Sequence, residues 1–157
     1  MRVGWSLRPL GVFPGVSRCP RAVLSGVLSP LLWCLVVNVL LARLIERGVY
    51  VQGYENNICL LAVGKFPNMV SGLIQWALHT VELWCGGLGL SVNPNKTGLV
   101  VFTRKRKLTG LKEHRLFGKT LQRSTSVKYL GAILRSRLTW KEHIDAKLRK
   151  ALHSKWA

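Results

Sequence analysis

A short polar segment between two apolar runs constrains this chain more than any other feature. The apolar runs cover residues 48–52 and 58–63, and the segment between them reads Gly53-Tyr54-Glu55-Asn56-Asn57. Asparagine tolerates the positive φ angles that tight turns require, so the pattern predicts a β-hairpin with Glu55, Asn56 and Asn57 at its tip. The only aspartate of the chain is Asp145, far from this tip.

The 157-residue chain is strongly and unevenly basic. Lys and Arg number 24 against 6 Asp and Glu, which gives a formal charge of +18. Residues 102–157 contain 16 basic and 3 acidic residues, whereas residues 1–101 contain 8 and 3. Such an excess is typical of proteins that bind a polyanion. The length and the 48% hydrophobic content fit one folded domain.

The cysteines and histidines do not have the spacing of a metal site. The four cysteines are far apart without a Cys-x-x-Cys pair, and the four histidines add no ligand spacing, so we predict no zinc. Cys34, Cys59 and Cys85 lie in apolar stretches, where we expect buried free thiols. Free thiols fit a reducing compartment. We therefore predict an intracellular protein, nuclear or cytoplasmic, and not a secreted one.

The longest apolar segment, residues 27–41, has two interpretations. A membrane-spanning helix needs about 20 predominantly apolar residues, and Pro30 and Asn38 interrupt this segment. We therefore predict a core helix that begins near Pro30 and stops at Gly48, and no membrane association. The alternative is a small basic membrane-associated protein that is anchored at residues 31–41.

Much of the remaining chain alternates between helical and extended patterns. Residues 68–85 place apolar side chains at helical spacing before Gly86-Gly87, so an amphipathic helix is predicted there. Short strands are predicted at residues 90–92 and 99–102, on either side of a turn. Residues 1–24 have no period and are predicted to be irregular. The whole pattern predicts an α+β fold in which antiparallel strands are backed by two helices.

The C-terminal part is predicted to contain further strands and a basic helix. Residues 115–122 are predicted to form a strand pair around Gly118, and residues 127–134 a single strand. A helix is predicted to open at Thr139, where Glu142 completes a possible capping box. Three tryptophans fall on helical apolar stripes and are predicted to be core residues rather than base-stacking platforms: Trp76, Trp84 and Trp140.

Basic side chains of the C-terminal part form a predicted track for nucleic acid. Contacts to the phosphate backbone release counterions and are independent of base sequence, so RNA or DNA is the predicted partner, without sequence specificity. The alternative is a basic face that only keeps the protein in solution. The residues predicted to contact the backbone are Arg104, Lys105, Arg106, Lys107, Lys128, Lys141, Lys147, Arg149 and Lys150.

Four segments, taken in order, resemble the reverse transcriptases of non-LTR retrotransposons of the jockey or R1 type. Residues 26–33, GVLSPLLW, resemble the motif that leads into the long palm helix of that family. Residues 53–57 fall where the family has its catalytic hairpin. In that family the tip of the hairpin reads Tyr-Ala-Asp-Asp. Residues 89–97, GLSVNPNKT, resemble the following palm motif, and residues 127–131 with 138–140 resemble the primer grip and the start of the thumb.

This resemblance covers most of the chain after about residue 25 and implies a domain organisation. Residues 25–126 would form a partial polymerase palm, and residues 127–157 a primer-grip-like strand and the start of a helical thumb. The resemblance also implies residues that contact the template or the nucleotide, and among them it implies that Lys96 lies near the nucleotide phosphates. These are Leu28, Ser29, Pro30, Lys96 and Thr97.

The resemblance fails at the residues that hold metal in the active family. Active members use two Mg²⁺ ions, which need carboxylate ligands. The hairpin of this chain offers Tyr54, Glu55, Asn56 and Asn57, and the amides lack the anionic charge that two dications require. Residues 1–24 contain no Asp or Glu, so we expect the palm strand with the first catalytic aspartate to be absent, as in a truncated or frameshifted copy.

The sequence therefore predicts a reverse-transcriptase-derived polypeptide that has lost catalysis. No metal ion or other cofactor is expected, although the active family uses Mg²⁺. The remaining property would be nonspecific binding of nucleic acid through the C-terminal third. The alternative in the enzyme class is an active RNA-directed DNA polymerase module that is completed by another chain.

Overall fold

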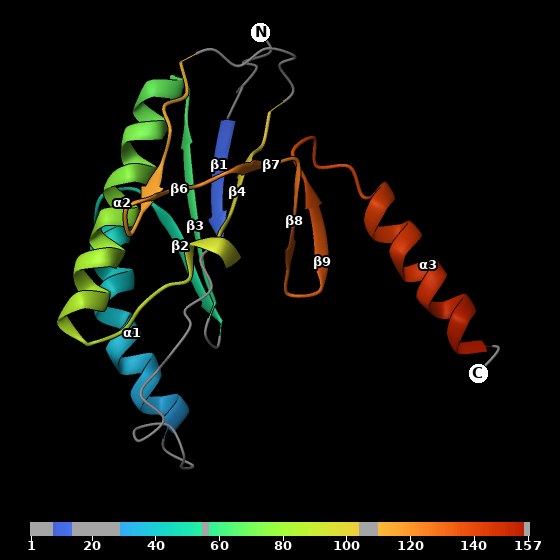
Figure 1. Ribbon diagram of the computed structural model, residues 1–157, viewed down its shortest axis with the longest axis horizontal. Helices are drawn as coiled ribbons and strands as arrows, with labels where there is room; N and C mark the ends of the chain where they lie inside the picture. The colour runs from blue at the N-terminus through green and yellow to red at the C-terminus, as the bar shows by residue number, and fades with distance from the viewer. Residues whose placement is uncertain (1–7, 14–28, 55–56, 104–109, 156–157) are drawn as a thin grey trace, which may run out of the picture.

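The largest unit of the protein is a five-stranded sheet that carries two helices on one face (Figure 1). The structure is a computed structural model, which describes residues 8–13, 29–54, 57–103 and 110–155. Along the chain, the elements of this unit are β1 (Arg8–Phe13), α1 (Ser29–Glu46), β2 (Tyr50–Tyr54), β3 (Asn57–Gly64), α2 (Pro67–Gly87), the short 3₁₀ helix η1 (Pro94–Lys96), β4 (Gly98–Val101) and β7 (Arg123–Ser124).

The strand order is β2-β3-β1-β4-β7. Pairing is antiparallel from β2 to β4, whereas β7 joins β4 in parallel. The helices α1 and α2 each connect two parallel strands that are separated by one strand of opposite direction. This βαββαβ arrangement, in which each helical connection passes over one intervening strand, is called ferredoxin-like. The predicted α+β class, with antiparallel strands backed by two helices, is confirmed for this part of the chain.

Both large helices end in the same backbone motif. At the end of α1, Gly48 has a φ of 79° and the N–H of Val49 donates to Leu44 O at 3.2 Å. At the end of α2, Gly89 has a φ of 64° and the N–H of Leu90 donates to Cys85 O at 2.8 Å. A glycine in the left-handed region followed by this bond is the Schellman motif. The stop at Gly48 is therefore confirmed, whereas α2 runs through the Gly86-Gly87 pair to a later glycine.

The main core lies between the sheet and the two helices. Alternate residues of β3 face the helices, and Leu60 and Ala62 are completely buried. They pack with Leu40 of α1 and with Leu78 of α2 in one cluster. Burial of leucine side chains of this kind contributes about 1.5–3 kcal/mol each. The helical face of the sheet thus holds most of the hydrophobic stabilisation.

The strand β1 corrects, at residues 8–13, the prediction that the N-terminal segment is irregular. Arg8–Phe13 form an inner strand, which pairs with β3 along one edge and with β4 along the other. Pro9 and Gly11 lower the strand propensity of this segment, and the two neighbouring strands override that preference.

The opposite face of the sheet is partly covered by a hairpin of β8 (Ser126–Tyr129) and β9 (Ala132–Arg135). Val127 of β8 packs against Val100 and Phe102 in a second, smaller core. The hairpin also comes close to Gly98, where an added Cβ would lie 2.9 Å from a methyl carbon of Val127. The predicted single strand at residues 127–134 is therefore wrong, because the chain reverses at its centre.

Two tight turns in the C-terminal part of the chain use residues with positive φ. Tyr129 and Ala132 pair across Leu130 (φ 46°) and Gly131 (φ 79°), which is the pattern of a type I′ turn. The predicted strand pair around Gly118 has the same geometry, with β5 (Arg115–Leu116) and β6 (Lys119–Thr120) joined through Phe117 (φ 48°). Leucine is strained at such an angle, whereas asparagine tolerates it.

We expect Leu130→Asn to stabilise the protein by about 1 kcal/mol, because it relieves the left-handed strain at an exposed position. The measurement is the free energy of unfolding in urea. The matched control is Leu88→Asn, which is also exposed but has an ordinary φ of −108°. An equal gain in both variants would contradict the role of the turn.

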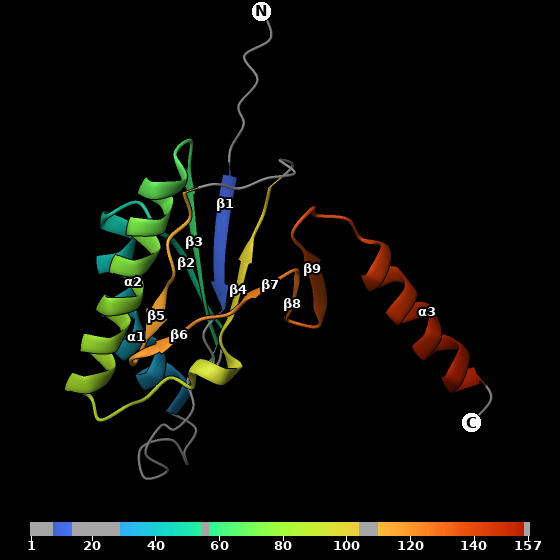
Figure 2. The same ribbon diagram turned by 45° about the horizontal axis from the view of Figure 1, so that its top comes forward.

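The last helix, α3 (Lys141–Lys155), stands apart from the sheet on the side opposite α1 and α2 (Figures 1 and 2). Its apolar residues remain exposed, and Trp140, which precedes it, is 57% exposed. The prediction that Trp140 is a core residue is therefore wrong, whereas Trp76 and Trp84 do pack against the main core. Cys34 is likewise exposed rather than buried. Among the described helices, none is both long and apolar enough to cross a membrane.

Candidate functional site: the hairpin end of the sheet and the basic C-terminal part

The predicted hairpin is present, as β2 and β3, and its tip lies at one end of the sheet. Tyr54 pairs with Asn57, so only Glu55 and Asn56 connect the two strands, and these two residues lie outside the described part. The C-terminal end of β1 reaches the same end of the sheet, where Phe13 pairs with Gly98 directly after η1. Figure 2 shows β1 pointing toward η1 at this end. The topology thus brings together three segments that are far apart in sequence.

The donor atoms described at this end of the sheet do not fit a pair of magnesium ions. The described residues of β1, β2 and β3 include no Asp or Glu, and the exposed Asn57 offers a neutral amide. Mg²⁺ sites of the two-metal type need several convergent carboxylates. Among the described residues, no group of three or more His, Cys, Asp and Glu side chains is placed to hold a metal ion.

The residues that the resemblance implies as contacts to the template or the nucleotide have different environments. Lys96 is exposed in η1, at the hairpin end of the sheet. Thr97 is buried, and its hydroxyl donates to Asn93 O at 3.0 Å, so it holds the turn together. Ser29 and Pro30 begin α1, whereas Leu28 lies outside the described residues.

The predicted basic track is described only in part. The described members, Lys128 of β8 and four basic residues of α3, are all exposed, whereas residues 104–107 lie outside the described part. Residues 126–155 contain eight Lys and Arg but only two acidic residues. One acid, Glu142, lies 3.1 Å from a guanidinium nitrogen of Arg135. The segment therefore carries a clear excess of basic over acidic side chains.

The structure adds one basic residue, Arg137, that the sequence prediction did not include, and it leaves the predicted apolar stripe of the last helix exposed. Arg137 is exposed between β9 and α3, and nothing in its local pattern distinguished it from other loop arginines. Ile144 and Leu148 of α3 are exposed at a spacing of four residues, in line with Trp140. Lys147 and Lys150 are three residues apart and share a neighbouring face of the helix. The helix therefore presents an apolar stripe beside basic side chains.

A buried polar contact between α2 and the chain before β5 was not predicted from sequence. His114 Nε2 lies 3.1 Å from Ser71 Oγ and 3.2 Å from Ser71 O, and the N–H of Lys112 donates to Ser71 Oγ at 3.1 Å. Gln75 adds two bonds to the backbone of Arg115. A lone histidine 43 positions away in sequence gives no signal for such a contact. These bonds attach residues 112–115 to α2.

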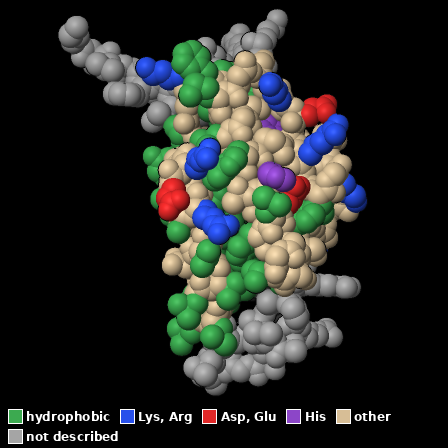
Figure 3. Space-filling model, turned by 90° about the vertical axis from the view of Figure 1, so that its left-hand side faces the viewer, with side chains coloured by type: hydrophobic (Ala, Val, Ile, Leu, Met, Phe, Trp, Pro, Cys, Tyr) green, Lys and Arg blue, Asp and Glu red, His purple; other side chains and the backbone are tan. Residues whose placement is uncertain are grey.

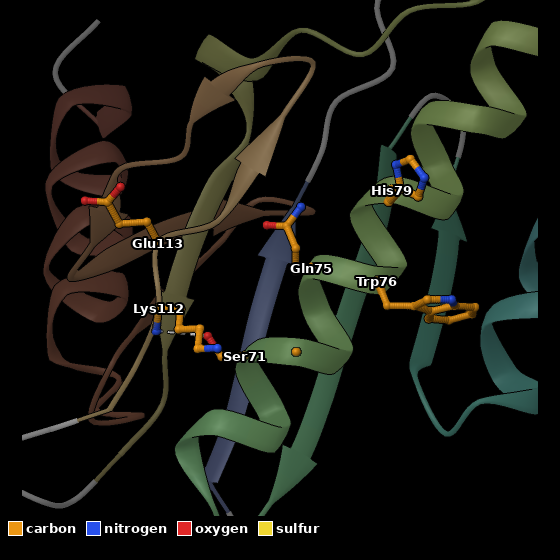
Figure 4. Close-up of a pocket in the computed structure, with 7 residues that line it drawn as sticks. Ser71, Gln75, Trp76, His79, Lys112 and Glu113 are labelled. Atoms are coloured by element: carbon orange, nitrogen blue, oxygen red, sulfur yellow. Dashed lines mark hydrogen bonds between the residues drawn. The ribbon is translucent and has the colours of Figure 1, made fainter.

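A cleft of about 440 Å³ lies beside this contact (Figure 4). Its lining includes Ser71, His79 and Glu113, the residue types of a hydrolytic site. Ser71 is buried and already bonded, and His79 pairs with Glu82 of its own helix at 3.3 Å. In Figure 4, His79 and Glu113 come from different elements and do not converge on Ser71. The arrangement is that of a structural contact and not of a nucleophile with its base.

The histidine of this contact makes the protein sensitive to acid. Burial lowers the pKa of His114, and the nearby charge of Arg123 lowers it further, although the bond to Ser71 acts in the opposite direction. The Nδ1 atom is buried and finds no partner among the described atoms. Protonation therefore favours the unfolded state, in which the pKa returns to about 6.5. The contribution of neutral His114 to the stability is therefore complete above pH 6.5. It is lost as the pH falls from 6.5 toward the lower pKa that His114 has in the folded state.

We expect the free energy of unfolding to decrease between pH 7.5 and 5.5 by up to about 1.4 kcal/mol per pH unit from this residue. Urea unfolding at several pH values measures the slope. In His114→Gln the slope should become flatter. Equal slopes in the parent and in His114→Gln would contradict this assignment.

Comparisons with known proteins give relatives of one kind. No protein-family model matches the chain. The chain is 25% identical over 153 residues to a retrovirus-related Pol polyprotein from type-1 retrotransposable element R1 2 of Nasonia vitripennis, a match that covers 88% of this chain and 36% of that protein. It is 34% identical over 104 residues to a probable RNA-directed DNA polymerase from transposon BS of Drosophila melanogaster, covering 66% of this chain and 12% of that protein. The chain thus spans well under half the length of either relative.

Proposed function

We propose that this chain is a reverse-transcriptase-derived polypeptide that binds nucleic acid without nucleotidyl transfer. The chain is a homologue of the Pol polyproteins and RNA-directed DNA polymerases of non-LTR retrotransposons, at modest identity and over part of its length. The observation that carries this proposal is the absence of carboxylates from the described residues of three adjacent strands, β1, β2 and β3.

The order of elements supports a palm assignment for the first part of the chain. A long helix that begins at the Leu-Ser-Pro motif precedes the hairpin, and the lysine motif follows α2. We assign residues 25–126 to a partial palm, with β1 as an additional inner strand. Residues 127–157, which contain most of the β8–β9 hairpin and α3, correspond to a primer grip and the start of a thumb.

The loss of catalysis follows from the charge of the donor set. Two-metal nucleotidyl transfer requires carboxylates that hold both ions beside the primer hydroxyl and the leaving group. The sequence offers Glu55 beside two amides at the hairpin tip, and β1 offers no acid. We therefore expect this chain to hold no Mg²⁺ pair.

Primer extension tests this part of the proposal. The chain is incubated with a primed RNA template, labelled dNTPs and Mg²⁺ or Mn²⁺, and no incorporation is expected. The variant Asn56→Asp/Asn57→Asp is tested alone and together with an added palm piece that carries the first aspartate. Incorporation by the unaltered chain would refute the proposal. Incorporation by the unaltered chain only with the added piece would support the alternative, a polymerase module completed by another chain.

Nucleic-acid binding is assigned to the basic C-terminal part. Within residues 126–155, six described cations are exposed: Lys128, Arg137, Lys141, Lys147, Arg149 and Lys150. Exposed cations with few acidic neighbours bind phosphates through counterion release, which does not depend on base sequence. RNA or DNA is therefore the proposed partner, and a nuclear or cytoplasmic location stays a prediction.

Paired charge removals test this assignment. We expect Lys147→Gln/Lys150→Gln to weaken binding of a labelled 20-nucleotide RNA about tenfold at 50 mM salt, measured by fluorescence anisotropy. The matched control, Lys112→Gln/Lys119→Gln, removes two exposed charges elsewhere on the protein. An equal loss in both variants would point to the net charge alone rather than to α3.

A further inference from the structure

A second cleft lies where the end of α1 meets the start of α2. Its volume is about 660 Å³, which is within the range of ligand sites. We call it the α1–α2 cleft, and its lining includes Arg47, Lys65, Phe66, Met69, Leu73 and Trp76. It lies on the helical side of the protein, and the face seen in Figure 3 carries basic side chains among hydrophobic ones. The basic helix α3 is on the other side of the sheet (Figure 1).

Aromatic and apolar side chains are unusually exposed at this cleft. Phe66 is 64% exposed and Met69 is 70% exposed, although both precede or begin a helix that buries its other face in the core. Trp76 forms part of the wall and is partly buried against the main core. Exposed aromatic rings beside a cavity provide surfaces on which a flat ring can stack.

Two cations accompany these rings, and the cleft has no acidic lining residue. The guanidinium carbon of Arg47 lies 5.1 Å from the ring centroid of Trp76, within cation–π distance. Lys65 is exposed next to Phe66. The first turn of α2 adds positive potential, because Phe66 provides no side-chain cap for its N–H groups. Flat apolar surface and positive charge together match a nucleotide, with a base for the rings and a phosphate for the cations.

We infer that the α1–α2 cleft binds one or two nucleotides of a single-stranded nucleic acid, with a base against Phe66 and phosphates beside Arg47 and Lys65. This inference rests on the proposed nucleic-acid binding and adds a contact on the face away from α3. The charge of the lining favours nucleic acid over an apolar peptide, which would gain nothing from two cations and would desolvate them. Stacking tolerates any base, so this contact is also independent of sequence.

Photocrosslinking tests the site. The probe is an eight-nucleotide RNA in which 5-iodouracil replaces uracil, irradiated with the whole chain and mapped by mass spectrometry. Crosslinks are expected at Phe66 or Trp76. In Phe66→Ala the affinity for this RNA should fall on the order of tenfold, because a stacked base is lost. The exposed side chain can be removed without loss of the core, and Leu83→Ala, 64% exposed on the same helix, is the matched control.

A second probe separates stacking from charge. Binding of inorganic polyphosphate should weaken in Arg47→Gln/Lys65→Gln but should stay unchanged in Phe66→Ala. If the RNA binds and crosslinks only within residues 126–155, and Phe66→Ala leaves its affinity unchanged, the inference is overturned while the proposed function stands. If the RNA does not bind the folded chain at all, both fail. Equal loss of polyphosphate binding and RNA binding in Phe66→Ala would also overturn the inference that a base stacks in the α1–α2 cleft.

Discussion

Raising the salt concentration from 50 to 200 mM is expected to lower the affinity of this protein for single-stranded RNA by about 300-fold. Six exposed cations are described in and around β8 and α3, and each phosphate contact contributes about 0.7 to the logarithmic salt slope on a single strand. For duplex DNA the contribution is about 0.9 per contact, and the expected loss is about 10³-fold.

The measurement is a titration of labelled RNA at four or more salt concentrations, followed by fluorescence anisotropy. The slope reports how many phosphates are neutralised, and it should be the same for RNAs of unrelated sequence. In Lys147→Gln/Lys150→Gln the slope should decrease by about 1.4, since two contacts are lost. A salt slope near zero in the unaltered chain would contradict nucleic-acid binding through these cations.

The second large effect concerns the core between the helices and the sheet. We expect Leu78→Ala to lower the free energy of unfolding by about 2–5 kcal/mol, because the completely buried side chain leaves a cavity among α1, α2 and β3. For a protein of this size, the melting temperature should fall by roughly 10 °C.

The control for this prediction lies on the same helix. Leu83→Ala removes the same atoms from a side chain that is 64% exposed, so its effect should stay within about 0.5 kcal/mol. Circular dichroism during urea and thermal unfolding measures both variants. Similar losses in the two variants would mean that α2 does not pack on the sheet through Leu78.

The elements that follow from local patterns were predicted from sequence. The helix α1, the helix α2 and the β2–β3 hairpin each have a clear apolar period or turn signal within a short stretch. The β8–β9 hairpin was missed because Leu130-Gly131 lacks the Asn-Gly signal of a type I′ turn. The strand β1 was missed because its conformation depends on two neighbours that lie far along the chain.

The candidate sites were predicted less completely than the fold. The basic residues of α3 could be found because charge is visible in composition, and the hairpin tip because its residue types are unusual. The exposure of Trp140 could not be predicted, since an apolar stripe at helical spacing normally indicates burial. The contact of Ser71 with His114 and the α1–α2 cleft depend on how separate elements meet, which no local pattern contains.

The inner position of β1 has a consequence for how the protein is made. The strand is synthesised before both of its partners, and Gly98 at the start of β4 follows Phe13 by 85 residues (98 − 13). At about 5–20 residues per second, the ribosome takes roughly 4–17 s to supply that second partner. During this interval β1 has at most one neighbour with which to pair. Chaperones that hold nascent chains during synthesis should therefore raise the yield of native protein. Their effect should exceed that of changing the buffer in which the full-length chain is refolded.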